Sequence, residues 1–245
     1  DAVADVPEQP TTQKAIFGFG DTGSVSAITN LVNSSGVVAS DTSGVGSARS
    51  GPAATGYGLD TAIFAYGYTG SRVSMSNLVN NSGVVATDVT GVGTARNILA
   101  AARYGGDKAI FGYGYDGGRA SMTNLVSSSG VIGSDVTGVG TGRSSLAATA
   151  YGTDKAIFGY GYSAASSTNS MTNLVTNAGV VGSDVTGVGT ARYAPAATGY
   201  GTDKAIFGYG TTGGTNFLSV TNLVSNSGVV ATDTSGVGTA RSGPG

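Results

Sequence analysis

The sequence predicts an all-β protein made of five copies of one small antiparallel sheet, and three observations support this fold class. An Ala-Ile-Phe motif starts at Ala15, Ala62, Ala109, Ala156 and Ala205, so the copies are spaced by 47, 47, 47 and 49 residues. Glycine is the commonest residue, with 43 copies among 245 residues, and each glycine disfavours helix by about 1 kcal/mol relative to alanine. Charged residues make up only 11% of the chain and apolar residues 40%, which is too apolar for a disordered protein.

Each copy divides into four short strands. In the copy that contains Ala156, a run of small residues leads to a Gly-Thr-Asp turn, because glycine and aspartate tolerate the dihedral angles of a tight reversal. The Lys-Ala-Ile-Phe-Gly-Tyr run that follows is apolar on both faces, which suits a strand buried on both sides. A loop of variable sequence then precedes two more apolar runs joined by an Asn-Ala-Gly turn. The predicted strands of this copy are 146–151, 155–160, 171–175 and 180–183.

Four such strands cannot bury both faces of a single sheet, but several sheets stacked around an axis can. The run of small residues suits the crowded position nearest the axis, so we expect it to be the innermost strand. The sequence therefore predicts a five-bladed β-propeller with four-stranded antiparallel blades and a repeat of about 47 residues. A β-solenoid is disfavoured because its coils are usually shorter, and an open stack of hairpins because its edges would be exposed to aggregation.

An arginine, a small-residue strand, a Tyr-Gly turn and an Ala-Ile-Phe-Gly-Tyr-Gly run follow one another in that order, which resembles the repeat of the kelch β-propeller family. The resemblance spans residues 14–241. Two features depart from the kelch pattern: an aromatic residue splits the paired glycines, as in Gly112-Tyr113-Gly114, and the usual tryptophan is absent. The unit length and the number of units are also similar to those of tachylectin-type five-bladed lectins. The glycine-rich array resembles phage-encoded virion or tail-associated proteins.

The small-residue strand is one copy short of the other three. It begins near Ala53, Ala100, Ala147 and Ala196, and no fifth copy follows Arg241. We therefore divide the chain into an N-terminal segment, 1–13, and the propeller, 14–245, with units starting at about 14, 61, 108, 155 and 204. We expect 1–13 to close the ring within its own molecule. The alternatives are strand addition from a neighbouring subunit, which would give a homo-oligomer, and a longer array of which this chain is a fragment.

The composition argues against several classes of function. The net charge is −2 and no basic stripe is present, so we expect no nucleic-acid partner. No apolar run approaches the roughly 20 residues that cross a bilayer, so we expect no membrane insertion. Cysteine and histidine are absent, which removes thiolate metal sites and the usual base of a serine nucleophile. We expect no enzyme, no cofactor and no metal; a hydrolase with paired carboxylates is the catalytic alternative.

In every unit an aspartate is followed by an arginine eight residues later. We interpret these pairs as structural, with the aspartate capping a turn and the arginine bridging neighbouring blades by hydrogen bonds. The alternative, a ring of five cation or ligand sites, is disfavoured because each turn offers only one carboxylate. The pairs are Asp41 with Arg49, Asp88 with Arg96, Asp135 with Arg143, Asp184 with Arg192, and Asp233 with Arg241.

The loops between the second and third strands differ most from unit to unit, so a locally encoded binding site is expected there. Three of these loops hold a tyrosine, and two combine it with an arginine. Tyrosine and arginine offer planar contacts and adaptable hydrogen bonds. The alternative interpretation is that these are tolerant surface loops whose sequences have drifted. The candidate ligand-binding residues are Tyr68, Arg72, Tyr115, Asp116, Arg119, Tyr162 and Phe217.

Together these observations predict a non-catalytic structural or recognition propeller that binds a protein or glycan surface through its variable loops. We expect it to be extracellular or virion-associated, in a tail- or fibre-type assembly. The alternative is a multivalent carbohydrate-binding lectin with equivalent sites between the blades.

Overall fold

The computed structural model describes residues 15–163 and 167–243, and every regular element within them is a strand. No helix in this part of the chain is long and apolar enough to cross a membrane. The strands form five main antiparallel sheets, one for each copy of the repeat, which we number 1 to 5 along the chain. They are β1 (Ala15–Asp21) and β2 (Val25–Val32) in sheet 1; β3 (Ala53–Tyr57), β4 (Thr61–Tyr68) and β5 (Arg72–Val79) in sheet 2; β6 (Ala100–Tyr104), β7 (Lys108–Gly112) and β8 (Thr123–Val126) in sheet 3; β10 (Ala147–Tyr151), β11 (Lys155–Gly159) and β13 (Thr172–Val175) in sheet 4; β14 (Ala196–Tyr200), β15 (Lys204–Gly208) and β16 (Thr221–Val224) in sheet 5; and a separate pair, β9 (Arg143–Ser144) with β12 (Tyr162–Ser163).

The middle strand of each three-stranded sheet carries the Ala-Ile-Phe motif. In β11 the four residues after Lys155 are all buried, so the expectation of a strand covered on both faces is confirmed. Ala156 lies opposite Ala150 of β10 on one side and opposite Val175 of β13 on the other. The same register recurs in sheets 2, 3 and 5, because the same residues stand at the same positions of each unit.

Two residues after the phenylalanine of each Ala-Ile-Phe motif, an aromatic residue has a left-handed backbone conformation. Tyr160 has a φ of 64°, and the following Gly161 has a φ of 103°. A positive φ costs a non-glycine residue about 1–2 kcal/mol, so packing must compensate for it. The bend turns the aromatic ring toward the next sheet, where the rings of Tyr160 and Phe207 lie 5.1 Å apart. The same pair of positive φ angles occurs at the corresponding positions of the other units, at Phe19, Tyr66, Tyr113 and Tyr209.

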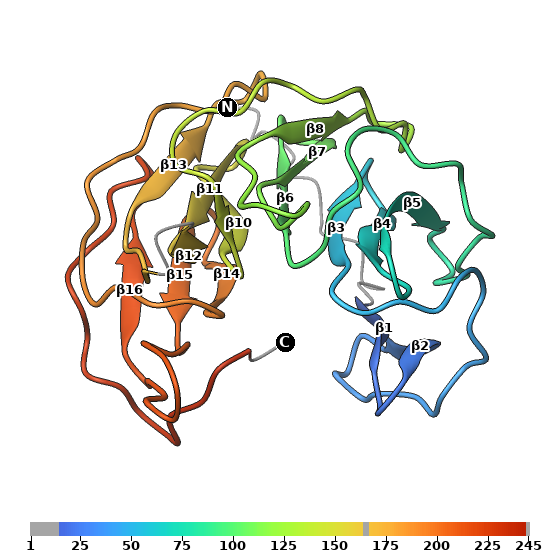
Figure 1. Cartoon of the computed structure of the whole chain (residues 1–245), viewed down its shortest axis with the longest axis horizontal. Coiled ribbons are helices and arrows are strands. Elements are labelled where there is room, and N and C mark those ends of the chain that lie inside the picture. Colours follow the sequence, from blue (N-terminus) through green and yellow to red (C-terminus); the bar gives the residue numbers. More distant parts are fainter. Residues whose placement is uncertain (1–14, 164–166, 244–245) are drawn as a thin grey trace, which may run out of the picture.

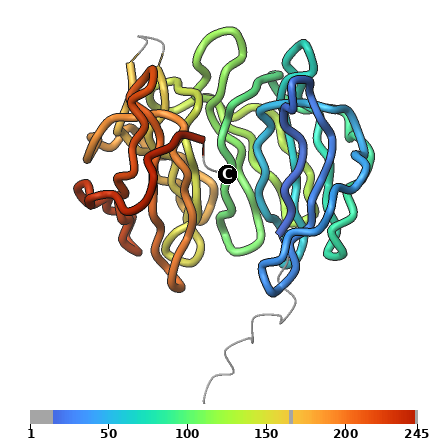
Figure 2. Tube along the Cα trace, turned by 90° about the horizontal axis from the view of Figure 1, so that it is seen from below, coloured from blue at the N-terminus to red at the C-terminus, as the bar shows by residue number. Residues whose placement is uncertain are grey.

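The five sheets stand side by side around an axis, with the small-residue strands β3, β6, β10 and β14 innermost (Figure 1). Consecutive inner strands contact one another, and the buried apolar clusters extend from one sheet to the next. The ring is open between sheet 1 and sheet 5, and the view turned by 90° shows the same opening between the two ends (Figure 2). The described residues therefore form an all-β, propeller-like array of antiparallel sheets.

Among the described residues, sheet 1 has two strands and no innermost one, in line with the count of small-residue runs. Its two strands carry the Ala-Ile-Phe motif and the third-strand motif of the unit. The segment 1–13, which we expected to close the ring, lies outside the described residues.

The fourth strand predicted for each unit is reduced to isolated bridges. In the predicted strand 180–183, Val181 bridges Val175, and beyond it Val185 bridges Thr172. Between these bridges the side-chain Nδ2 of Asn173 donates a hydrogen bond to the carbonyl of Gly182. This side-chain hydrogen bond interrupts the backbone ladder, and an asparagine does the same in each of the other units. Sheets 2 to 5 therefore have three regular strands where the sequence predicts four.

Candidate functional site

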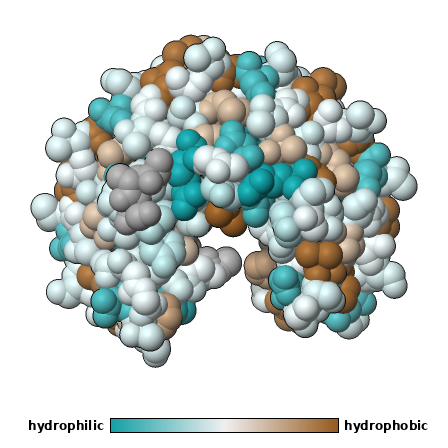
Figure 3. Space-filling model, in the orientation of Figure 1, coloured by the Kyte–Doolittle hydropathy of each residue, from teal (hydrophilic) through white to brown (hydrophobic). Residues whose placement is uncertain are grey.

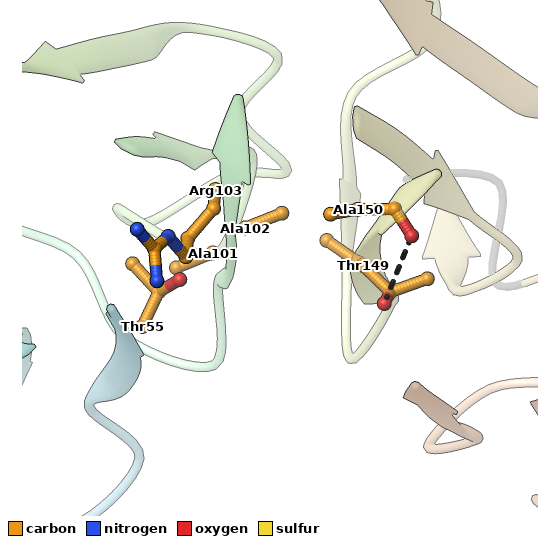
Figure 4. A pocket seen from close by; sticks show the side chains of 7 residues that line it. Thr55, Ala101, Ala102, Arg103, Thr149 and Ala150 are labelled. Carbon is orange, nitrogen blue, oxygen red and sulfur yellow. Dashed lines mark hydrogen bonds between the residues drawn. The ribbon is translucent and has the colours of Figure 1, made fainter. Parts of the chain in front are cut away.

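The innermost strands line a shallow cavity on the axis of the ring. Figure 4 shows that its walls are small side chains from β3, β6 and β10 and that Arg103 is the one charged residue among them. The Nη2 of Arg103 donates to the main-chain carbonyls of Gly58 and Gly106, so this guanidinium links neighbouring inner strands. The lining offers no other ionisable side chain to a ligand. The lining residues are Thr55, Ala101, Ala102, Arg103, Ala148, Thr149 and Ala150.

A buried arginine joins neighbouring sheets. Arg143 is fully buried, and its guanidinium stacks on the ring of Tyr113 in sheet 3 at 4.7 Å. Its Nη2 donates to Oδ1 of Asn173 in sheet 4 at 2.6 Å, and its Nη1 lies 3.5 Å from Oδ1 of Asp184. The N and Oγ1 of Thr141 donate to Oδ2 of Asp184 at 3.0 and 2.8 Å. We call these four polar residues, together with the stacked ring, an arginine cluster.

The arginine cluster occurs four times, always between one sheet and the next. The sequence interpretation paired Asp184 with Arg192, but the structure pairs Asp184 with Arg143 of the preceding unit. The reason is topological. Each arginine lies at the end of its unit, where the chain passes to the next one, so its side chain enters the interface with the following sheet. The four clusters are Arg49 with Ser47, Asn77 and Asp88; Arg96 with Thr94, Asn124 and Asp135; Arg143 with Thr141, Asn173 and Asp184; and Arg192 with Thr190, Asn222 and Asp233.

Burial and hydrogen bonding set the charges in these clusters. Desolvation lowers the pKa of Arg49 to about 10, against the opposing effect of Asp88, so the guanidinium stays charged at neutral pH. Desolvation raises the pKa of Asp88, but hydrogen bonds from Ser47 and Asn77 and the charge of Arg49 outweigh it and hold that pKa below its usual value. The same balance lowers the pKa of the three other cluster carboxyls, Asp135, Asp184 and Asp233.

These carboxyls predict a loss of stability in acid. Because their folded-state pKa lies below the unfolded value of about 3.9, their contribution is complete above that pH and is lost as the pH falls through the folded-state pKa. We expect the urea midpoint to fall below about pH 4. Asp184→Asn should make this fall shallower, because one of the four carboxyls with a lowered pKa is then absent. Superimposable profiles for Asp184→Asn and the parent chain would contradict this expectation.

The variable loops bring four of the seven candidate ligand-binding residues into one row. The guanidinium of Arg72 lies over the ring of Tyr115 at 4.3 Å. Arg119 lies over the same ring at 4.8 Å and over Tyr162 at 5.2 Å. The ring of Tyr162 in turn meets the edge of Tyr193 at 5.3 Å. These five side chains lie in segments that flank sheets 2 to 5, and they form what we call the Tyr–Arg ladder.

Tight turns place the ladder residues. Tyr115 and Arg119 bridge each other across a turn in which Gly117 has a φ of 131°, a conformation that favours glycine. Asp116 accepts a hydrogen bond from the N–H of Gly118 at 2.9 Å and so stabilises the turn. Tyr68 and Arg72 are paired in the same way across the preceding loop. The hairpins thus fix the spacing between a tyrosine and an arginine within a unit.

The cations of the ladder lack acidic partners. Among the described residues, neither Arg72 nor Arg119 forms an ion pair. Their Nε atoms are buried and have no hydrogen-bond partner there, and neither has Oδ1 of Asn97, whose backbone pairs with Tyr115. The ladder therefore combines cations that lack acidic partners with half-buried aromatic rings, which are features of a binding site.

The other candidate residues are placed differently. Tyr68 and Phe217 are exposed, and in the described part of the chain neither makes an aromatic or cation–π contact. Asp116 serves its own turn. Sequence reasoning missed Tyr193, because it lies outside the variable loops. The available signal was its position directly after a cluster arginine, where the other units have Ser50, Asn97 and Ser144.

Comparisons with known proteins bear on the fold. No protein-family model matches the sequence, and no curated protein sequence matches it. Solved structures do match: the structure of YjhT superposes with a TM-score of 0.67 at 11% sequence identity, covering 90% of this chain and 81% of that chain. At this identity the similarity concerns the fold alone.

Proposed function

We propose that this chain is a non-catalytic recognition module, a five-bladed propeller of the kelch-like type whose variable loops bind a partner. Counting the bridged outer segment as the fourth strand gives sheets 2 to 5 the four strands of a propeller blade. The observation that supports binding is the Tyr–Arg ladder, since it joins side chains that flank four successive sheets and that differ from unit to unit. The extracellular or virion-type setting expected from the sequence is part of the same proposal.

The chemistry of the ladder favours an acidic partner. Arg72 and Arg119 keep their faces on tyrosine rings, so the edges of their guanidinium groups are left for carboxylates, which the planar fork binds in a bidentate manner. The half-buried rings of Tyr115, Tyr162 and Tyr193 add apolar contact surface beside these guanidinium groups. We therefore expect a carboxylate-bearing surface on a protein or a glycan.

The repeated interfaces favour this reading over a lectin with equivalent sites between the blades. In each arginine cluster the arginine already donates to the asparagine across the interface, and the asparagine donates to the aspartate of its own unit. These polar groups stabilise the scaffold and hold neighbouring loops at fixed distances. A binding site is better supported where the units differ, in the ladder.

The proposal is tested with an array of neutral glycans, carboxylated glycans and acidic peptides probed with the full chain. We expect binding to carboxylated members at one site per chain. Arg119→Ala should weaken it at least about tenfold, because it removes a guanidinium whose charged hydrogen bonds to a carboxylate contribute about 1.5–3 kcal/mol. Tyr115→Ala should weaken it to a similar extent, because it removes the ring that holds both guanidinium groups in place. Arg103→Ala removes an arginine from the axial cavity and should leave binding unchanged.

Two results would count against the proposal. Binding at several equal sites per chain, unaffected by the ladder variants, would identify the lectin alternative. If the chain bound no carboxylated member of the array, the ladder would not be a recognition surface for carboxylates.

A further inference from the structure

The two ends of the open ring carry opposite halves of one interface. In each complete interface the preceding sheet contributes an aromatic residue, a serine or threonine, and the arginine. The following sheet contributes a phenylalanine, the asparagine and the aspartate. The interface between sheets 3 and 4 shows both halves, with Tyr113, Thr141 and Arg143 on one side and Phe158, Asn173 and Asp184 on the other.

The edge of sheet 5 carries the first half. Arg241 stacks on the ring of Tyr209 at 3.8 Å, and its Nη1 donates to the carbonyl of Thr239 at 3.1 Å. The four cluster arginines are fully buried, whereas Arg241 is exposed. A Cβ added to Gly238 would meet only the hydroxyl of Tyr209, whereas the corresponding Gly189 lies against the aspartate and asparagine of the next sheet.

The edge of sheet 1 carries the second half. The Nδ2 of Asn30 donates to Oδ1 of Asp41 at 2.8 Å, as in every complete cluster. Among the described residues, no serine or threonine donates to Asp41 and no arginine reaches Asn30. Phe17 is 53% exposed. The phenylalanines at its position in the other units, Phe64, Phe111, Phe158 and Phe207, are 3% exposed or less.

The geometry keeps these two halves apart within one chain. The four complete interfaces use the same residues and the same contacts, so each turns the chain by a similar angle about the axis. If that angle were one fifth of a turn, sheet 5 would pack on sheet 1. Instead the ring stays open, and the space-filling view shows the opening as a notch between the two ends (Figure 3).

We propose that the opening receives one further unit of this same repeat. Its phenylalanine, asparagine and aspartate would complete the cluster of Arg241. Its aromatic residue, its serine or threonine, and its arginine would complete the cluster of Asn30 and Asp41. An intact second copy fits less well. If one of its end sheets occupied the opening, its other four sheets would continue around the same axis and overlap with sheet 1 and the sheets after it. This inference does not depend on the Tyr–Arg ladder.

The test joins the probe unit to the full chain. A copy of residues 193–241 is appended directly after Arg241, so that the tether holds the unit at high effective concentration. We expect a monomer by mass and a urea midpoint above that of the parent chain. In the extended chain Arg241→Ala and Asn30→Ala should each lower the midpoint as much as Arg143→Ala does. In the parent chain Arg241→Ala should leave the midpoint nearly unchanged, and Asn30→Ala should cost only its own hydrogen bonds to Ala39 and Asp41.

The matched control is the same extension with Asn222→Ala and Asp233→Asn introduced in the appended copy. It keeps the length and the apolar residues but cannot complete the cluster of Arg241, so it should give a clearly smaller rise. An extended chain no more stable than the parent, or one in which Arg241→Ala stays silent, would overturn the proposal.

The parent chain supplies the remaining outcomes. A monomeric parent in which Arg241→Ala is as damaging as Arg143→Ala would mean that sheets 5 and 1 meet directly. A parent with the mass of two copies, which Arg241→Ala returns to one, would identify a second copy as the occupant. Either result would overturn the proposal.

Discussion

Arg143→Ala is expected to lower the free energy of unfolding by about 3 kcal/mol or more, whereas Arg241→Ala, at the same position of the repeat, should change it by less than about 0.5 kcal/mol. Arg143 is fully buried, and its loss leaves Oδ1 of Asn173 without a donor and Asp184 without its cation. Removing one partner of a buried charged pair typically costs 3–5 kcal/mol. Asp184 is 29% exposed, which places the expected loss at the lower end.

The measurement is urea unfolding of the two variants beside the parent chain. Arg143→Met is a useful second variant, because it keeps a long side chain over Tyr113 and removes only the charge and the hydrogen bonds. If Arg143→Met recovers most of the stability, the cluster stabilises chiefly by packing. A loss below about 1 kcal/mol for Arg143→Ala would contradict the expectation, since a buried, multiply bonded arginine cannot then be what joins the sheets.

The repeat predicts the strands well because the same local signals occur in every unit. The run after Lys155 is apolar on both faces, and β11 is buried on both faces. The turn residues Gly152 and Asp154 lie between β10 and β11, as predicted. The shortage of one small-residue strand also follows from counting alone, and the described part of sheet 1 has only two strands.

Near-identity of the units is also why the sequence could not assign the partners of the clusters. Asp184 has one repeated arginine eight residues after it, Arg192, and another in the preceding unit, Arg143. Periodicity alone cannot tell which of these two arginines is its partner. The structure selects the partner across the interface, Arg143 with Asp184. Asn173 offered an overlooked signal, since asparagine is unfavourable in strands and yet occupies this position in every unit.

The candidate site was predicted only in part for a different reason. Arg72, Tyr115, Arg119 and Tyr162 stood out because the loops that hold them vary. Their contacts run from one unit to the next, and such contacts depend on how the sheets are stacked. Tyr193 joins the row from a segment that precedes an inner strand, so only the arrangement of neighbouring sheets brings it beside Tyr162.

Phe158→Ala should be the most damaging of the apolar substitutions, with an expected loss of about 3–5 kcal/mol. The side chain is fully buried and packs against the ring of Tyr113 at 5.1 Å between centroids. A Cβ added to Gly112 would lie 2.7 Å from Cζ of Phe158, so the ring is tightly surrounded. The neighbouring atoms are therefore expected to fill little of the cavity that alanine would leave. Phe17→Ala, at the same position in sheet 1, should cost less than about 0.5 kcal/mol because that ring is already exposed.

The position of Phe158 in the array adds a second expected effect. In a repeat protein each unit contacts only its neighbours, so weakening one interface uncouples the units on either side of it. Phe158 lies between sheets 3 and 4, and its loss separates three units from two. We therefore expect the denaturant transition of Phe158→Ala to broaden or to split into two steps. A single transition of unchanged slope, shifted no further than that of Phe17→Ala, would show that stability does not depend on packing between these sheets.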